Sequence, residues 1–206
     1  MLINILKRSI AAGILISLGA VVKLRCENQL AGDVLFSIGL YFICSYGMYL
    51  FTGKIGYINK TNWAQYPVIW IGNLLGCIIA MLLIRVADPC YHTAVSTMME
   101  VKLGQSIVTT AVLSFFCGVI MYLAVENSLR QQAHVSKIFG IVIGVTVFLI
   151  SGFEHSIADM AYSVLYITTA TDATECLIFV LCVSVFNALG AITMRWILNP
   201  CGRTQE

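Results

Sequence analysis

The sequence predicts an all-α membrane protein, and its composition is the first reason. Of the 206 residues, 59% are hydrophobic and only 11% are charged, whereas an ordinary soluble domain carries about 25% charged residues. The formal net charge is +2, and no basic stripe accompanies it. We therefore expect one transmembrane domain over residues 1–206 and no nucleic-acid partner.

Six apolar segments are the second reason. A helix needs about 20 predominantly apolar residues to cross a bilayer, and most of the segments approach this length. They run approximately over residues 9–22, 31–51, 63–86, 106–125, 136–166 and 175–198. The second segment runs into a break that ends in glycine, Leu50-Phe51-Thr52-Gly53, and the fifth is too long for a single crossing. The sequence therefore predicts six transmembrane helices, of which the second and the fifth are interrupted.

Similarities between the two halves of the chain are the third reason. Thr52 and His155 each follow a phenylalanine by 16 positions, which aligns the second and fifth segments with these two residues as equivalents. An Asn-Leu-Leu-Gly run begins at Asn73, and an Asn-Ala-Leu-Gly run begins at Asn187. Because each half has three segments, the halves would lie in opposite orientations, as an inverted 3+3 repeat. The predicted repeats cover about residues 9–86 and 106–198.

The distribution of lysine and arginine sets the expected orientation. Cytoplasmic loops carry an excess of basic residues. With the N-terminus inside, eight of the 12 basic residues face the cytoplasm: Lys7, Arg8, Lys54, Lys60, Arg130, Lys137, Arg195 and Arg203. An even number of crossings then predicts a multi-pass protein of the cell (inner or plasma) membrane with both termini cytoplasmic.

The candidate functional centre is the run 151–160, inside the fifth segment. It places Glu154 and His155 at a depth where an unpaired charge is costly, so both must be buried in protein or line a polar cavity. A lone buried histidine is more often structural. Here the adjoining acid and the helix break favour a functional role, because ionisable residues inside membranes usually mark substrate or proton pathways.

These motifs resemble the formate/nitrite transporter family. The run from Ser151 to Ala158 is similar to the signature of its fifth helix, and Leu50-Phe51-Thr52 is similar to the loop that interrupts its second helix. Gly-Asn and Phe-Asn pairs at Asn73 and Asn187 resemble its polar elements in helices three and six. The resemblance implies an aquaporin-like protomer with its own pore, and a homopentamer. It also implies small monovalent anions of weak acids as substrates: formate or nitrite first, hydrosulfide as the alternative.

The resemblance also implies roles for single residues. His155 corresponds to the central pore histidine and Thr52 to the threonine that faces it. Lys102 corresponds to a lysine that attracts anions, and Glu154 to the acid that holds this lysine. Asp159 differs, since the family usually has asparagine there. The apolar constrictions would be formed by Phe36, Leu40 and Phe148 on the outer side and by Leu50 and Phe51 on the inner side.

Elementary physics suggests how such a path would work. An anion crosses an apolar ring at a large desolvation cost, whereas a neutral acid does not. Lys102 would attract the anion, and His155 would exchange a proton with it, because histidine titrates near neutral pH. The partners are then small anions, protons and the lipid bilayer, with no cofactor and no metal.

Two other classes of function remain open at this point. A neutral-solute pore of aquaporin-like type would also have six helices in an inverted repeat, but the chain lacks an Asn-Pro-Ala triplet. A membrane enzyme could use Glu154 and His155 for acid–base chemistry, but no nucleophile or metal cluster accompanies them. We expect a channel or transporter and not an enzyme.

Overall fold

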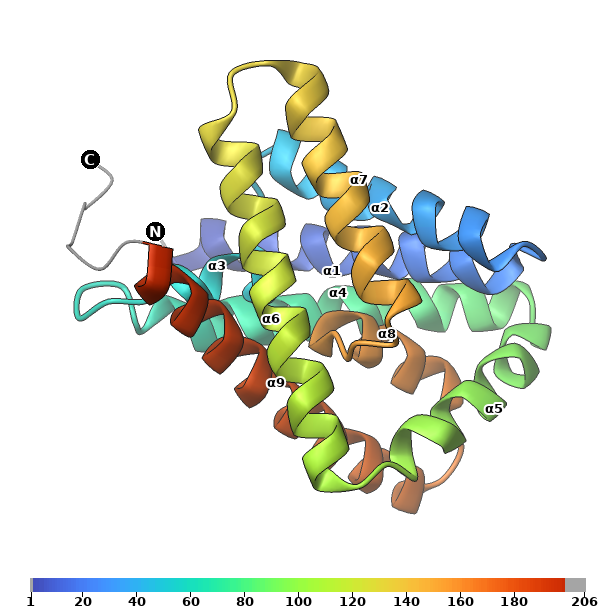
Figure 1. Ribbon diagram of the computed structural model, residues 1–206. Helices are drawn as coiled ribbons and strands as arrows, with labels where there is room; N and C mark the ends of the chain where they lie inside the picture. Colours follow the sequence, from blue (N-terminus) through green and yellow to red (C-terminus); the bar gives the residue numbers. More distant parts are fainter. Residues whose placement is uncertain (1, 199–206) are drawn as a thin grey trace.

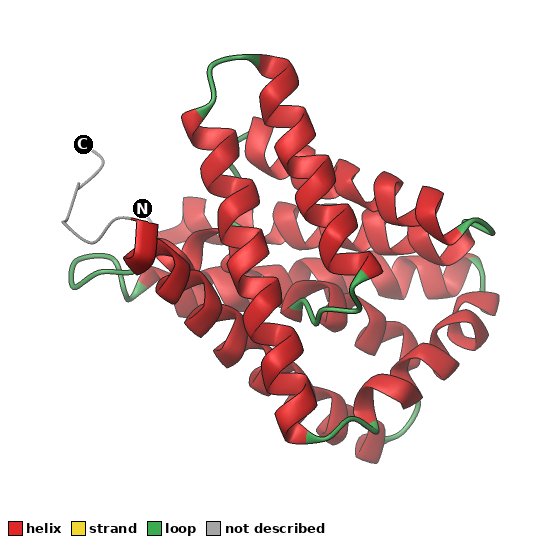
Figure 2. Cartoon of the chain, in the orientation of Figure 1, coloured by secondary structure: helices red, strands yellow, loops and turns green. Residues whose placement is uncertain are grey.

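The computed structural model describes residues 2–198, and every regular element in this range is a helix (Figure 2). In chain order the elements are α1 (Leu2–Arg25), α2 (Gln29–Ser45), α3 (Phe51–Lys54), the 3₁₀ turn η1 (Ile55–Tyr57), α4 (Gln65–Ala87), α5 (Cys90–Leu103), α6 (Ile107–Arg130), α7 (His134–Ile150), α8 (Ser156–Tyr166) and α9 (Ala170–Leu198). Arg203, one of the basic residues assigned to the cytoplasmic side, lies outside the described residues.

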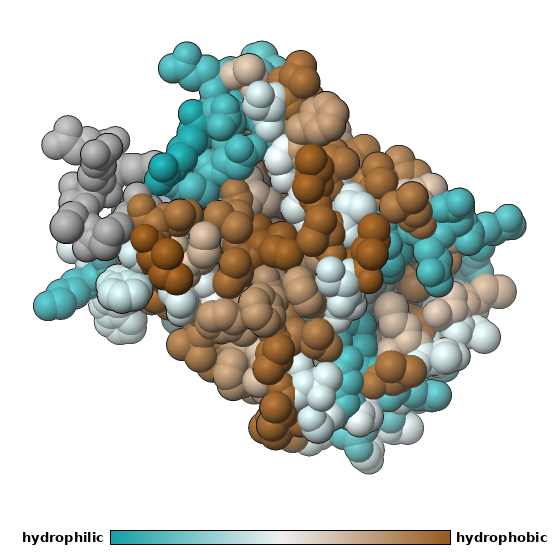
Figure 3. Space-filling view, viewed as in Figure 1, coloured by the Kyte–Doolittle hydropathy of each residue, from teal (hydrophilic) through white to brown (hydrophobic). Residues whose placement is uncertain are grey.

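The outer surface is strongly apolar. Within residues 2–198, α1, α4, α6 and α9 are long and apolar enough to cross a membrane, and α2 and α7 are shorter apolar helices. Large apolar side chains such as Leu83 and Ile178 are more than half exposed. Figure 3 shows apolar residues over the middle of one face, with hydrophilic residues gathered toward its ends. Such a surface is suited to lipid or to other subunits. The expected six crossings stay a prediction.

The helices pack as two similar groups. One group joins α1 to α2 and α4, and the other joins α6 to α7 and α9; the short helix α8 lies between them and contacts both α4 and α9 (Figure 1). Glycines allow the closest approaches. A Cβ on Gly13 would lie 2.1 Å from the carbonyl oxygen of Asn73, and a Cβ on Gly118 would lie 2.1 Å from that of Asn187. Small residues permit this packing where lipid gives helices no hydrophobic drive to associate.

Two breaks in the helices bring the chain toward the centre. Residues 46–50 separate α2 from α3, and residues 151–155 separate α7 from α8. Gly47 (φ +60°) and Gly152 (φ +65°) each adopt the left-handed conformation directly after a helix end. Glycine is the residue that takes this conformation at no steric cost, which explains why both helices end there.

Asn73, on α4, satisfies the backbone at the first break. Its side-chain oxygen accepts a hydrogen bond from the amide of Phe51 at 2.9 Å. Its side-chain nitrogen donates to the carbonyl of Tyr49 at 2.9 Å and to that of Ser9, on α1, at 2.8 Å. These bonds clamp the backbone on both sides of Leu50. Without them, polar backbone groups would be buried unpaired.

Asn187, on α9, does the same at the second break. Its side-chain oxygen accepts from the amide of Ser156 at 2.9 Å, and its nitrogen donates to the carbonyls of Glu154 and Ser114, both at 2.8 Å. The backbone is therefore clamped on both sides of His155, as the first asparagine clamps Leu50.

The matching bonds correct one detail of the alignment made from sequence. They put Leu50 at the position equivalent to His155, so taking Thr52 as its equivalent was wrong by two residues. The spacing from a phenylalanine gave the wrong alignment because the pattern of apolar residues does not show where each helix breaks. The hydrogen bonds made to the broken segments do show it.

Helix α5 was also not expected, because residues 90–103 are too polar for a membrane segment. It forms because Val95 and Met99 become fully buried, while its other face stays largely exposed. Packing against α8 thus stabilises a helix that hydropathy does not predict.

We predict that Gly118→Ala lowers the thermal unfolding midpoint of the detergent-solubilised protein by about 5 °C, because the added methyl must displace the α9 backbone. Val112→Ala, on the same helix but half exposed, is the control and should change little. Tryptophan fluorescence on heating measures both. Equal midpoints would contradict this close contact between α6 and α9.

We predict a larger loss for Asn187→Leu, which keeps the side-chain size but leaves one buried amide and two carbonyls without this partner. The midpoint should fall by about 10 °C, since each unpaired buried group costs about 1–3 kcal/mol. Gln132→Leu, at an exposed amide, is the matched control. The role assigned to Asn187 would be refuted by a midpoint equal to that of the control.

Candidate functional site

An ionic cluster joins α5 to the second break. Lys102, in the last turn of α5, forms an ion pair with Glu154 and a second one with Asp159, whose Oδ1 lies 3.0 Å from the lysine Nζ. Gln105 donates a hydrogen bond to the other oxygen of Glu154 at 2.9 Å. Both acids are 1% exposed, and Oδ2 of Asp159 has no hydrogen-bond partner among the described residues. Two carboxylates therefore share one ammonium group.

The pair of His155 and Thr52 lies at the centre, where the two breaks meet. The Nε2 atom of His155 is 2.8 Å from the Thr52 hydroxyl, and both side chains are buried. The Nδ1 atom accepts a hydrogen bond from the amide of Ala158 at 3.1 Å and so caps the N-terminus of α8. Because Nδ1 is an acceptor, the neutral ring carries its hydrogen on Nε2 and donates it to Thr52.

Aromatic rings cover one side of this pair. The ring of Phe148 stacks on that of His155, with centroids 5.4 Å apart, and Phe36 contacts Phe148 edge-on at 6.1 Å. Leu40 lies one helical turn after Phe36 on α2, and all three apolar side chains are at most 2% exposed. The imidazole is therefore covered by buried apolar side chains on this side.

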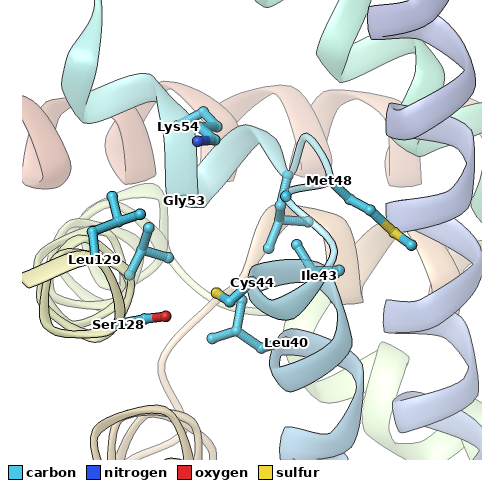
Figure 4. A pocket seen from close by; sticks show the side chains of 11 residues that line it. Leu40, Ile43, Cys44, Met48, Gly53, Lys54, Ser128 and Leu129 are labelled. Atoms are coloured by element: carbon cyan, nitrogen blue, oxygen red, sulfur yellow. The ribbon is translucent and has the colours of Figure 1, made fainter. Parts of the chain in front are cut away.

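A hollow that is partly open to solvent borders Leu50 and Leu40 (Figure 4). It is lined by parts of α2, the first break, α3 and α6: Leu40, Ile43, Cys44, Gly47, Met48, Leu50, Gly53, Lys54, Val125, Ser128 and Leu129. Phe51, the other residue expected at the inner constriction, is buried beside it but does not line it. Leu40, expected at the outer constriction, borders this hollow as well.

The residues expected at the site thus fall into distinct groups. Lys102, Glu154 and Asp159 lie together, and His155 contacts Thr52. Asn73 and Asn187 instead hold backbone in place, a role that only the positions of the breaks reveal.

Sequence reasoning missed Gln105, which contacts Glu154, and the polar groups of the hollow, Cys44, Lys54 and Ser128. The one available signal was Lys54, a basic residue only two positions after Thr52.

Comparison with known proteins agrees with this geometry. A family model described as formate/nitrite transporter matches residues 2–201. The formate channel FocA of Escherichia coli (strain K12) is 28% identical over 178 residues, which cover 74% of this chain and 62% of that protein. The nitrite transporter NirC of the same organism is 30% identical over 173 residues, covering 74% and 64%. The match thus spans about three fifths of the length of these relatives, which are named as a channel and a transporter.

Solved structures share the fold. A structure described as a pentameric formate channel with formate bound superposes with a TM-score of 0.81 at 20% identity, covering 97% of this chain and 98% of the other. A second, described as an FNT family ion channel, gives 0.80 at 21% identity, with 95% and 87% covered. The all-helical fold with apolar helices is that of these channels, and the family resemblance is confirmed: this chain is a multi-pass membrane protein that belongs to the formate/nitrite transporter family.

Proposed function

We propose that the protein conducts small monovalent anions of weak acids, formate or nitrite first, across the cell membrane, with proton exchange at His155. Hydrosulfide is the alternative substrate within the same class. The observation that carries the proposal is the buried contact between His155 and Thr52. It lies between an ionic cluster at one end and an open hollow at the other.

Six crossings follow if each break interrupts one membrane segment. Helices α2 and α7 have 17 residues each, which gives about 26 Å against a hydrocarbon core of about 30 Å. Continuation through α3 and through α8 would complete both crossings. The matching bonds of Asn73 and Asn187 support an inverted repeat of residues 9–86 and 106–198 in an aquaporin-like protomer.

The assembly and orientation that fit best are a homopentamer with both termini in the cytoplasm. The basic residues gather on that side, as the positive-inside rule requires. Exposed apolar residues on the outer helices need lipid or neighbouring subunits as cover. The pentameric formate channel of the same fold supports an assembly of five copies.

Lys102 is the candidate attractor of anions at the outer end. Its charge is opposed by Glu154 and Asp159, so the cluster is net negative if both acids are ionised. A proton on the unpartnered Oδ2 of Asp159 would make the cluster neutral and remove its net repulsion of an anion. Glu154, which also receives a hydrogen bond from Gln105, is the better-satisfied carboxylate.

The apolar rings require the permeant to be neutral when it passes. Phe36 and Phe148 would close the path on the outer side of His155, and Leu40, Leu50 and Phe51 would close it on the inner side, all of them buried. A bare anion would lose its hydration there without replacement. Protonation at the centre removes this barrier, since the neutral acid loses little hydration energy when it enters the apolar ring.

Proton exchange at His155 is a balanced cycle. In the resting arrangement the ring is neutral, because Nδ1 accepts from the Ala158 amide. An anion beside Thr52 favours a protonated ring, which forms when Nδ1 takes up a proton from the solution and gives up the bond from Ala158. The ring then gives its Nε2 proton to the anion, directly or through the Thr52 hydroxyl, and the neutral acid leaves. Loss of the Nδ1 proton to the solution and uptake of one at Nε2 restore the resting ring, so each cycle consumes one proton for one anion.

Reconstituted flux tests the function. In proteoliposomes we expect uptake of formate and nitrite, faster at pH 5.5 than at pH 7.5, and no swelling in a neutral polyol. A panel with formate, nitrite and hydrosulfide identifies the substrate within the class. Rapid swelling in the polyol without anion uptake would favour a neutral-solute pore and overturn the proposal.

The role of His155 is tested by His155→Asn. Asparagine is a good helix N-cap, so α8 should keep its start while the proton-exchanging ring is gone. We expect uptake at pH 5.5 to fall about tenfold or more and its pH dependence to disappear. His134→Asn, at an exposed histidine on α7, is the control. A pH profile like that of the unaltered protein would exclude His155 as the proton donor.

A further inference from the structure

The hollow beyond Leu50 has a distinct electrostatic character. Of the side chains that line it, that of Lys54 is the one that carries a formal charge, and no acidic residue is among them. Lys54 makes no ion pair with the described acids; its Nζ lies 5.9 Å from the ring centroid of Tyr49. Its positive charge is therefore not compensated locally, in contrast to that of Lys102.

The walls of the hollow strengthen the effect of this charge on an anion. Most of the lining is apolar, with Leu40, Leu50 and Val125 among it, and such walls reduce screening by water. Two small polar groups, the hydroxyl of Ser128 and the thiol of Cys44, lie on the far side of the hollow from Lys54 (Figure 4). A cation, a hydroxyl donor and apolar walls are the ingredients of a site for a small anion of single charge.

We propose that this hollow is a second anion site, in which Lys54 holds a small monovalent anion at the inner end of the path. This second site extends the proposed function. It rests on that function in one respect, because the hollow is assumed to be one end of the route through His155. A neutral acid that has passed Leu50 would lose its proton to water here, and Lys54 would stabilise the anion that remains. The inner end would then attract anions more strongly than the outer end, where two acids offset the lysine.

Cys44 provides a native reporter of the potential in the hollow. It is partly exposed and lines the hollow with Lys54. Two methanethiosulfonate reagents of similar size, one bearing a sulfonate and one a trimethylammonium group, are reacted with the detergent-solubilised full-length protein. Mass mapping of the peptide that contains Cys44 gives each rate, so the other cysteines do not interfere. Both reagents react with the same thiolate of Cys44. The fraction of the thiol that is ionised therefore affects both rates equally and cancels in their ratio.

We expect the anionic reagent to be favoured in the unaltered protein. Lys54→Gln should lower the ratio of anionic to cationic rates about tenfold, the size expected for one charge nearby in a partly screened site. Lys54→Arg should preserve the ratio, and Lys60→Gln, at an exposed lysine in the following loop, is the matched control. Ser128→Cys places a second thiol in the same hollow and gives the same ratio if Cys44 reacts too slowly.

A ratio that Lys54→Gln leaves unchanged overturns the second anion site, whatever the flux. A ratio that falls in Lys54→Gln but not in Lys60→Gln supports it. Formate flux in proteoliposomes then separates the two proposals. If the ratio falls while the unaltered protein carries none of the anions, the site stands as a binding site and the proposed function is overturned.

Discussion

The structure depends on how two helix breaks deep in an apolar bundle satisfy their backbone. In a bilayer no water is available for an unpaired amide or carbonyl, so a broken helix is tolerated only where protein replaces the lost bonds. Asn73 and Asn187 each supply one acceptor and two donors for this purpose. The residue between the clamped groups, Leu50 in one break and His155 in the other, is thereby fixed toward the centre.

This constraint also explains the order of the parts along the path. His155 caps α8 and contacts Thr52 of α3 because both short helices begin at clamped breaks that face each other. Glu154, immediately before, is turned toward the end of α5, where Lys102 and, in the following loop, Gln105 contact it. One clamped segment thus positions both the imidazole at the centre and an acid of the ionic cluster beside it. A shift of this segment would therefore move both groups together.

The ionic cluster around Lys102 and the hollow beside Lys54 differ in charge balance, although the backbones of the two breaks match. At one end, two buried carboxylates surround Lys102. At the other, Lys54 borders a hollow without an acid in its lining. A cation attracts an anion only to the extent that it is not neutralised already, so under the proposed function the two regions would differ in affinity for anions. Matching backbone geometry therefore does not require matching function.

The sequence by itself determined the membrane class and the apolar helices, because burial in lipid leaves a direct pattern in composition, and its motifs indicated the family. It predicted an interruption within residues 151–160 because buried charge is costly there. It also singled out His155, Thr52, Lys102, Glu154 and Asp159, which the fold brings into two contacting groups. Only the tertiary structure decided that α5 is a helix, that Leu50 and not Thr52 matches His155, and that Lys54 faces a hollow. These features depend on which distant groups meet, a matter of packing and hydrogen bonding between helices that no local pattern of hydrophobicity records.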